Sequence, residues 1–251
     1  MPEHYASLVS IILIVSFAAT LMSSMSGGGS SMITVPTWLM LGYPLPLAMA
    51  TVSVSGATWT LFAAKTYLQG QNIDRKLLAG LIAFGLLGAF CGTQVVMYGN
   101  PKLLQRIVGW IILALVAYAF VRKDFGTKTG PAKVSVPITS IAGLPLGFYD
   151  AFFGSGNGYF VAAVLSSARG FDLLQALGYY YVLAFAWCTF AASIYIHGGN
   201  WNLWLMIPAV LGSVAGAILG SKIGKRHGAQ FVKRIFLAIG TILGAKLAIG
   251  F

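Results

Sequence analysis

Charged side chains are scarce in this 251-residue sequence, and acidic ones are the scarcest. Only 8% of the residues are charged, with 5 Asp and Glu against 16 Lys and Arg. A soluble domain carries about a quarter charged residues, so this composition excludes an ordinary soluble domain. The chain is instead 58% hydrophobic, and its apolar residues form long runs, which is typical of a polytopic membrane protein.

Cysteine and histidine are scarce as well. Both cysteines, Cys91 and Cys188, lie inside apolar segments, which fits neither a disulfide framework nor a metal site. The three histidines, His4, His197 and His227, are scattered through predicted loops. We therefore predict no metal ligands and no cofactor. The apolar segments also lack a catalytic His, Cys or paired carboxylate, so we predict no catalytic residues and disfavour a membrane enzyme.

The net charge of +11 does not indicate nucleic-acid binding. The basic residues occur in short patches between apolar segments, where the cytoplasmic loops of membrane proteins keep them. We therefore expect the lipid bilayer, and no nucleic acid, as a partner. The first apolar run follows Glu3 and His4 without a basic leading region, so it predicts a first membrane segment rather than a removed signal peptide.

The apolar pattern predicts an all-α fold of about eight spanning helices plus short broken or re-entrant segments. The predicted spans are 6–22, 47–68, 77–98, 103–121, 136–153, 173–196, 201–219 and 231–249. Two further apolar segments, 32–41 and 159–168, have only about ten residues and are too short to cross a bilayer.

The order of long and short segments occurs twice, which indicates an internal repeat. An offset of about 129 residues aligns Gly29 with Gly158 and Thr60 with Thr189, and an offset shorter by one aligns other positions, among them Gly88 with Gly216 and Gly92 with Gly220. Glycine is common in this chain, so some of these matches arise by chance. The shared order of segments is the stronger argument for a repeat.

Basic residues predict the orientation of the segments. The loops 122–133 and 222–227 are the most basic and are expected inside, whereas the loop 197–200 lacks Lys and Arg and is expected outside. Corresponding loops then lie on opposite sides, with both termini outside, which is an inverted-topology repeat of the kind many secondary transporters share. The predicted division is a first membrane repeat (1–124), a cytoplasmic linker (125–135) and a second membrane repeat (136–251).

Two Gly-rich stretches, 23–31 and 147–158, interrupt the helical pattern at matching places. Backbone groups cannot stay unpaired in lipid, so such breaks line a protein-enclosed cavity. A short helix that begins after each break offers free N–H groups and a positive end, which suit an anion. The candidate substrate-binding residues are Ser26, Gly27, Gly28, Gly29, Ser30, Ser31, Gly154, Ser155, Gly156, Asn157 and Gly158. The alternative is that these glycines only pack helices together.

Asp150 is a carboxylate placed at membrane depth, where charge is costly and is a functional hypothesis by default. It is the candidate coupling residue: burial favours the neutral form of a carboxyl group, so it could carry a proton, or it could bind Na⁺. The alternative is a structural role, in which Asp150 caps a broken helix or pairs with Lys65 or Lys246. Both lysines lie near segment ends, where Lys usually reaches the membrane surface.

Aromatic residues follow the second break as a run, Tyr179-Tyr180-Tyr181, with Trp187 further on. A tyrosine run near the start of a segment is typical of an interfacial belt, and a cavity wall is the alternative. The remaining tryptophans are expected to serve in packing or in the same belt; they are Trp38, Trp59, Trp110, Trp201 and Trp204.

Two groups of residues form longer motifs: Gly27-Gly28-Gly29 with Pro36 and Ala50-Thr51 in the first half, and the run 147–158 in the second. Together they resemble the TauE/SafE sulfite exporter family of bacterial inner-membrane permeases, and the likeness covers nearly the whole chain. Ser155 and Asn157 depart from the fuller Gly-rich second motif of many members. The segment 178–184 is aromatic where the related branch often has a Lys/Asn pattern, which suggests a sulfonate with an organic tail.

The resemblance implies a multi-pass protein of the bacterial inner membrane that exports sulfite, an organosulfonate or a related small anion. We expect a secondary transporter of this kind, coupled to protons or Na⁺ through Asp150. A passive anion channel, or a transporter of another small organic anion such as a carboxylate, is the alternative. The sequence leaves the direction of transport open, and it is compatible with a homo-oligomer.

Overall fold

The computed structural model describes residues 2–98 and 129–249, together with 110, 113–114, 116–117 and 120–121. Every regular element in these residues is a helix, so the all-α prediction is confirmed for this part of the chain. The predicted span 103–121 lies largely outside the described residues.

Five helices in the described part of the chain are long and apolar enough to cross a membrane, compared with about eight predicted. They are α1 (Pro2–Ser26), α3 (Leu45–Leu68), α4 (Arg75–Tyr98), α9 (Leu173–His197) and α10 (Leu203–Ile249). Helix α10 contains a kink at Gly228, where φ is 80° and ψ is −180°. The predicted loop 222–227 is therefore helical, and the predicted last span, 231–249, is the second arm of α10.

The predicted span 136–153 is divided into two short helices, α6 (Val136–Ile141) and α7 (Gly143–Phe152). The two short segments that were predicted after the breaks are present as α2 (Ser30–Met40) and α8 (Asn157–Arg169). Each begins after a glycine with positive φ, Gly29 at 117° and Gly156 at 79°. Glycine adopts this conformation without steric cost, which explains why both helices begin at these points.

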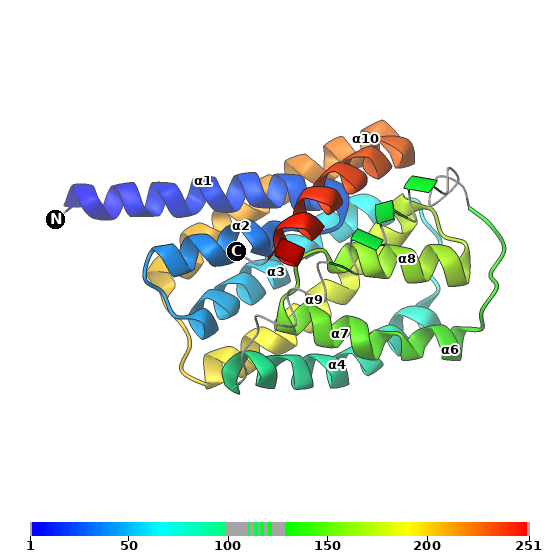
Figure 1. Ribbon diagram of the computed structural model, residues 1–251, viewed down its shortest axis with the longest axis horizontal. Coiled ribbons are helices and arrows are strands. Elements are labelled where there is room, and N and C mark those ends of the chain that lie inside the picture. Colours follow the sequence, from blue (N-terminus) through cyan, green and yellow to red (C-terminus); the bar gives the residue numbers. More distant parts are fainter. Residues whose placement is uncertain are drawn as a thin grey trace.

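The most extensive helix contacts join α1 to α10, α3 to α9 and α4 to α7, and Figure 1 shows α1 and α4 on opposite sides of the α3–α9 pair. Glycines let the outer pairs approach closely. A Cβ atom on Gly216 of α10 would overlap the backbone of Phe17 in α1, and one on Gly88 of α4 would overlap the backbone of Leu144 in α7. Small residues at a helix interface allow such backbone contact in membranes.

Helix α9 lies in the centre of the bundle, and its tyrosine run is buried. Tyr179, Tyr180 and Tyr181 are 1%, 4% and 0% exposed, so the predicted interfacial belt is wrong for them. The reason is that α9 contacts α3, α4, α7, α8 and α10, which leaves this part of the helix no lipid face. The tryptophans divide between the two expected roles: Trp38, Trp59 and Trp187 are buried, whereas Trp110, Trp201 and Trp204 are exposed.

One end of the bundle, at the right in Figure 1, carries the connections from α3 to α4 and from α8 to α9. We call it the basic end, because many of the described Lys and Arg residues lie there, among them Lys65, Arg75, Lys76, Lys133, Arg169, Lys222, Lys225 and Arg226. At the opposite end, α2 and α9 end and α3 and α10 begin. The described residues 38–46 and 195–205 at that end contain no Lys or Arg.

Candidate functional site

The two Gly-rich breaks contact each other in the middle of the bundle. Helices α1 and α7 end there, and α2 and α8 begin there and run toward opposite ends. A Cβ atom on Gly28 would lie 2.8 Å from the Cα of Gly156, and one on Gly158 would overlap the carbonyl oxygen of Gly27. The breaks therefore meet backbone to backbone, with no side chain between them.

Tyrosine hydroxyl groups satisfy the carbonyl groups at the two helix ends. The Tyr67 hydroxyl donates to the Ser24 carbonyl at the end of α1 (3.0 Å), and the Tyr195 hydroxyl donates to the Ala151 carbonyl at the end of α7 (3.1 Å). The Tyr181 hydroxyl also donates to the Ser24 carbonyl, at 2.9 Å. The last carbonyls of a helix lack partners within the helix, so these tyrosines stabilise the broken ends at membrane depth.

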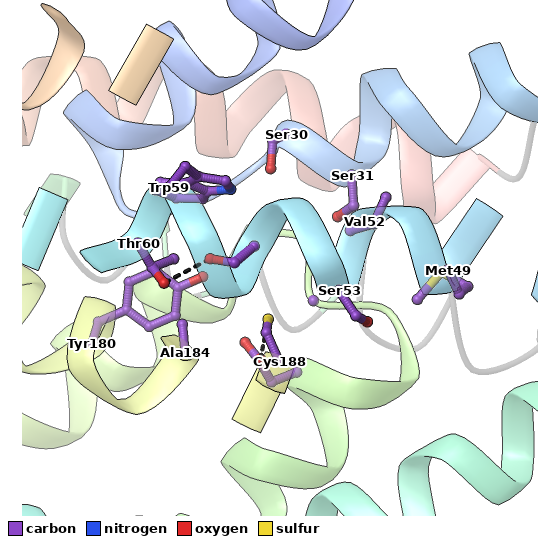
Figure 2. A pocket seen from close by; sticks show the side chains of 13 residues that line it. Ser30, Ser31, Met49, Val52, Ser53, Trp59, Thr60, Tyr180, Ala184 and Cys188 are labelled. Atoms are coloured by element: carbon purple, nitrogen blue, oxygen red, sulfur yellow. Dashed lines mark hydrogen bonds between the residues drawn. The ribbon is translucent and has the colours of Figure 1, made fainter. Parts of the chain in front are cut away.

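A small cavity, with a volume of about 30 Å³, lies beside this junction, between α3 and α9. Figure 2 shows Ser30 and Ser31 of α2, Ser53 of α3, and Tyr180 and Cys188 of α9 around it. The other lining residues are Met49, Val52, Gly56, Trp59, Thr60, Asp150, Gly154 and Ala184. A cavity needs about 10–15 Å³ of such volume to hold one water molecule, so this conformation accommodates only a guest of about two water molecules in size.

Several hydrogen-bond donors border the cavity. Within the described residues, the hydroxyl groups of Ser30, Ser53 and Tyr180 have no hydrogen-bond partner and can donate to a guest. The hydroxyl of Ser31 is already used, because it donates to the Phe153 carbonyl at 3.1 Å. The first turn of α2 also borders the cavity, and it offers unpaired N–H groups and the positive end of the helix dipole.

Asp150 lies on α7 and faces this cavity, with 6% of its surface exposed. The Asn157 Nδ2 donates to Asp150 Oδ1 at 2.8 Å and to the Leu146 carbonyl at 3.1 Å. The Cys188 thiol donates to Asp150 Oδ2 at 3.5 Å. Both side-chain partners of the carboxylate are therefore neutral hydrogen-bond donors.

The pairing of Asp150 with a lysine is not observed in the described residues. Lys65 lies in the last turn of α3 and is exposed, so it does not reach the buried carboxylate. The backbone of Lys246 belongs to α10, but its side chain lies outside the described residues.

The structure separates the predicted substrate-binding residues by their surroundings. Ser30, Ser31 and Gly154 line the cavity. Ser155, which follows Gly154, is buried; its carbonyl accepts from the Tyr149 hydroxyl, and its own hydroxyl has no partner among the described residues. The others form the junction of the two breaks or cap the short helices; they are Ser26, Gly27, Gly28, Gly29, Gly156, Asn157 and Gly158. Ser26, for example, donates to the Met22 and Gly28 carbonyls at 3.1 and 3.2 Å and so stabilises the first break.

Tyr180 of α9 lines the cavity, which agrees with the alternative given for the tyrosine run, but the other residues of α3 and α9 that form the cavity walls were not predicted from the sequence. Ser53, Thr60 and Cys188 lie inside regular helices, where no break in the apolar pattern marks them. The available signal was the row of hydroxyl residues at Thr51, Ser53 and Ser55 in an otherwise apolar segment. Polar residues within membrane helices usually face the interior of the bundle.

Long apolar helices, paired helix breaks and a polar central cavity together define a membrane transport protein. The comparison with known families agrees with this class. The family described as "Sulfite exporter TauE/SafE" matches residues 12–247, and the chain therefore belongs to the TauE/SafE sulfite exporter family.

Relatives of similar length are named as probable membrane transporter proteins. A "Probable membrane transporter protein" of Haemophilus influenzae is 25% identical over 243 residues, covering 96% of this chain and 94% of that protein. The "Probable membrane transporter protein YfcA" of Escherichia coli K12 is 24% identical, and the match covers 96% of this chain and 89% of YfcA. The "Probable membrane transporter protein YjnA" of Bacillus subtilis is 23% identical, and the match covers 95% of this chain and 99% of YjnA. No solved structure matches the chain significantly.

Proposed function

We propose that this protein is a secondary transporter that exports a small sulfur-containing anion, such as sulfite or an organosulfonate, across the bacterial inner membrane together with protons. One observation carries the proposal. The cavity that presents neutral hydroxyl donors and the start of α2 also contains the carboxylate of Asp150, whose side-chain partners are neutral.

The donors of the cavity suit an anion that must bind and then leave. Hydroxyl and backbone N–H groups hold a small oxyanion without the strong attraction of a lysine or arginine. The apolar wall of Met49, Val52 and Trp59 suits the organic tail of a sulfonate. A guest larger than water requires the cavity to widen, which is expected for a protein that alternates between conformations.

The shared cavity supplies a reason for coupling. An anion and an ionised Asp150 would repel each other strongly at low dielectric. A proton on Asp150 removes this repulsion, so proton and anion favour each other's binding, and the effect is reciprocal. The side-chain partners of the carboxylate are the Asn157 amide nitrogen and the Cys188 thiol, and neither atom is an oxygen ligand of the kind that a hard cation prefers.

We infer further that residues 1–124 and 136–251 are inverted repeats joined by the linker 125–135. Helix α1 packs on α10 of the other half, and α7 packs on α4 in the corresponding exchange. The glycines that cap the two short helices, Gly29 and Gly156, are 127 residues apart. The offset between the halves at the breaks is therefore two residues shorter than the offset of about 129 taken from the sequence.

The positive-inside rule places the basic end in the cytoplasm. In Figure 1 the N-terminus lies at the opposite end of the bundle, which this orientation assigns to the outside. The short helix α8 then runs toward the cytoplasm, and α2 runs toward the outside.

The test is uptake of labelled sulfite and of a small sulfonate into proteoliposomes, with and without a pH gradient. We expect gradient-driven uptake that falls about tenfold or more in Asp150→Asn, because the neutral amide cannot carry a proton. Asp172→Asn is the matched control. Asp172 is the N-cap of α9 and its carboxylate accepts from the Gln175 N–H at 2.8 Å, and asparagine caps a helix equally well.

The other outcomes identify the alternatives. Uptake that ignores both the gradient and Asp150→Asn would indicate a passive channel. Coupling to a Na⁺ gradient in place of protons would assign Asp150 to sodium. Uptake of a small carboxylate, but of neither sulfur compound, would leave a coupled anion transporter and overturn the substrate class.

A further inference from the structure

We propose that Asp74, Arg169 and Tyr179 form a gate that closes the basic end, and that the turn Tyr179-Tyr180-Tyr181 connects this gate to the cavity. The proposal rests on the transport function, because a gate has meaning only where a substrate passes. It goes beyond that function in naming the residues that keep one side shut.

The three tyrosines project in three directions, because successive residues of an α-helix are rotated by about 100°. Tyr180 lines the cavity. The Tyr181 hydroxyl donates to the carbonyls of Ser23 and Ser24 at the end of α1, at 3.2 and 2.9 Å. The Tyr179 hydroxyl accepts a hydrogen bond from the backbone N–H of Asp74. One helical turn therefore contacts the cavity, the first break and the α3–α4 connection.

Asp74 joins three helices at the basic end. Its Oδ1 accepts from the Leu77 N–H at 3.0 Å and so caps the start of α4. Its Oδ2 lies 3.6 Å from Arg169 Nη2 at the end of α8. Its backbone N–H reaches Tyr179 of α9. A separation of these helices at the basic end would have to break the ion pair and the Tyr179 hydrogen bond.

The linker adds to the closure at the same place. The N–H groups of Lys133 and Val134 donate to the Ala168 carbonyl at 2.9 and 3.0 Å, and the Gly130 N–H donates to the Gly170 carbonyl at 2.8 Å. Arg169 Nη1 also donates to the Val134 carbonyl at 2.7 Å. The end of α8 is thus held by the linker on one side and by Asp74 on the other.

Helix α10 is tied to this end through Lys225. Its Nζ donates to the carbonyls of Thr66 and Gln69 at the end of α3, at 2.7 and 2.8 Å. A cation placed at the C-terminal end of a helix also interacts favourably with the helix dipole. Five helices and the linker therefore meet in polar contacts at the basic end.

At the opposite end, the α9–α10 connection lies close to α4, because a Cβ atom on Gly198 would lie 3.2 Å from the terminal methyl of Met97. The cavity residues Met49, Val52 and Ser53 belong to the half of α3 that runs toward this end, whereas Thr60 of α3 and Tyr180 of α9 belong to the halves nearer the basic end. The cavity therefore lies in the middle of the bundle, and the polar contacts of the basic end lie on one side of it.

The strength of the gate suits a structure that opens in each cycle. The side chains of Arg169 and Asp74 are 16% and 34% exposed. Ion pairs with such access to water contribute little to stability, so this one can break and form again as the conformation changes.

The experiment uses the cavity thiol Cys188 as the reporter, in a Cys91→Ser background that removes the other cysteine, which is exposed on α4. A membrane-impermeant methanethiosulfonate is added to the basic-end side of sealed vesicles of known orientation. Asp74→Asn and Arg169→Gln should each increase the rate of Cys188 modification from that side by about fivefold, and Tyr179→Phe should increase it in the same direction.

Asp74→Asn preserves the cap of α4, because asparagine is as good an N-cap as aspartate. Asp172→Asn also removes a carboxylate at the basic end and keeps a helix cap, but Asp172 has no part in the gate, so its rate should equal that of the parent. Rates in the gate variants that equal the Asp172→Asn rate would overturn the proposal. An equal increase from both sides of the membrane would also overturn it, since it would indicate general loosening.

The labelling needs no transported substrate. A failed uptake assay with sulfite and sulfonate would therefore reject the proposed substrate class and leave the gate measurement readable, whereas unchanged labelling would reject the gate and leave the uptake result standing.

Discussion

The two helix breaks have the same backbone plan and different chemistry. Each follows a helix whose last carbonyls accept a tyrosine hydroxyl, Tyr67 in one half and Tyr195 in the other. Each precedes a short helix capped by a glycine of positive φ. The first break carries serines and no charge, whereas the second is joined to the carboxylate of Asp150.

The two breaks also contribute different groups to the surroundings of the cavity. The first break contributes the start of α2, with Ser30 and Ser31, to the cavity. The second contributes Asp150, and the offset of 127 places Ser23 at the corresponding position of the first half. The Ser23 hydroxyl is buried and has no partner in the described residues. Under the proposed function, hydroxyl donors would come from both halves, Ser30 and Ser53 from the first and Tyr180 from the second, whereas the proton carrier Asp150 belongs to the second half alone.

Substitution of a glycine in the backbone contact between the breaks should lower the stability of the protein most. In Gly158→Ala the new Cβ would overlap the Gly27 carbonyl. Inserting atoms into a packed core costs about 1–3 kcal/mol, and backbone atoms cannot move aside as side chains do. We expect Tm of the purified protein to fall by at least about 5 °C, measured by thermal unfolding in detergent.

Gly130→Ala is the control for this substitution, because a Cβ atom there meets nothing within 4 Å. The Tm of Gly130→Ala should equal that of the parent protein. If the Tm of Gly158→Ala also equals that of the parent, the two breaks do not touch as described.

Asn157→Ser tests the chemical difference between the breaks. Asn157 begins α8 and Ser30 begins α2, so the substitution gives the second short helix the same first residue as the first. Serine cannot replace the amide that binds both Asp150 and the Leu146 carbonyl. A hydrogen bond to a charged group contributes about 1.5–3 kcal/mol, so gradient-driven uptake should fall about tenfold.

Asn200→Ser is the matched change for Asn157→Ser, since the Asn200 side chain donates to the neighbouring Gly198 carbonyl in the exposed α9–α10 connection. It should transport as the parent does. Equal uptake by the two variants would show that Asn157 does not position the carboxylate.

The tyrosines that cap the ends of α1 and α7 should contribute slightly different amounts to stability. The Ser24 carbonyl accepts from both Tyr67 and Tyr181, whereas among the described side chains the Ala151 carbonyl accepts only from Tyr195. Side-chain hydrogen bonds in membrane proteins contribute about 0.6 kcal/mol on average, so Tyr195→Phe should lower Tm by about 2 °C and Tyr67→Phe by less. A larger loss in Tyr67→Phe would contradict this order.

The sequence predicted the helices and the places where they break, because apolar length and glycine clusters are local signals. It also predicted that Asp150 is buried, since its flanks are apolar. It could not predict that Gly28 and Gly156 touch, because that contact depends on how α1 and α7 pack against helices of the other half. The tyrosine run was misplaced for the same reason, as burial within a bundle depends on neighbours that are distant in the sequence.

The small volume of the cavity, about 30 Å³, has a consequence for inhibitors. A compound of drug size cannot enter this conformation, so it must bind when the bundle has opened and then act as a wedge that prevents closure. Its association rate would then follow the opening rate of the protein. A compound small enough to fill the cavity in this conformation would be about the size of water molecules and would displace only those. A compound that holds α3 apart from α9 would arrest the proposed transport cycle.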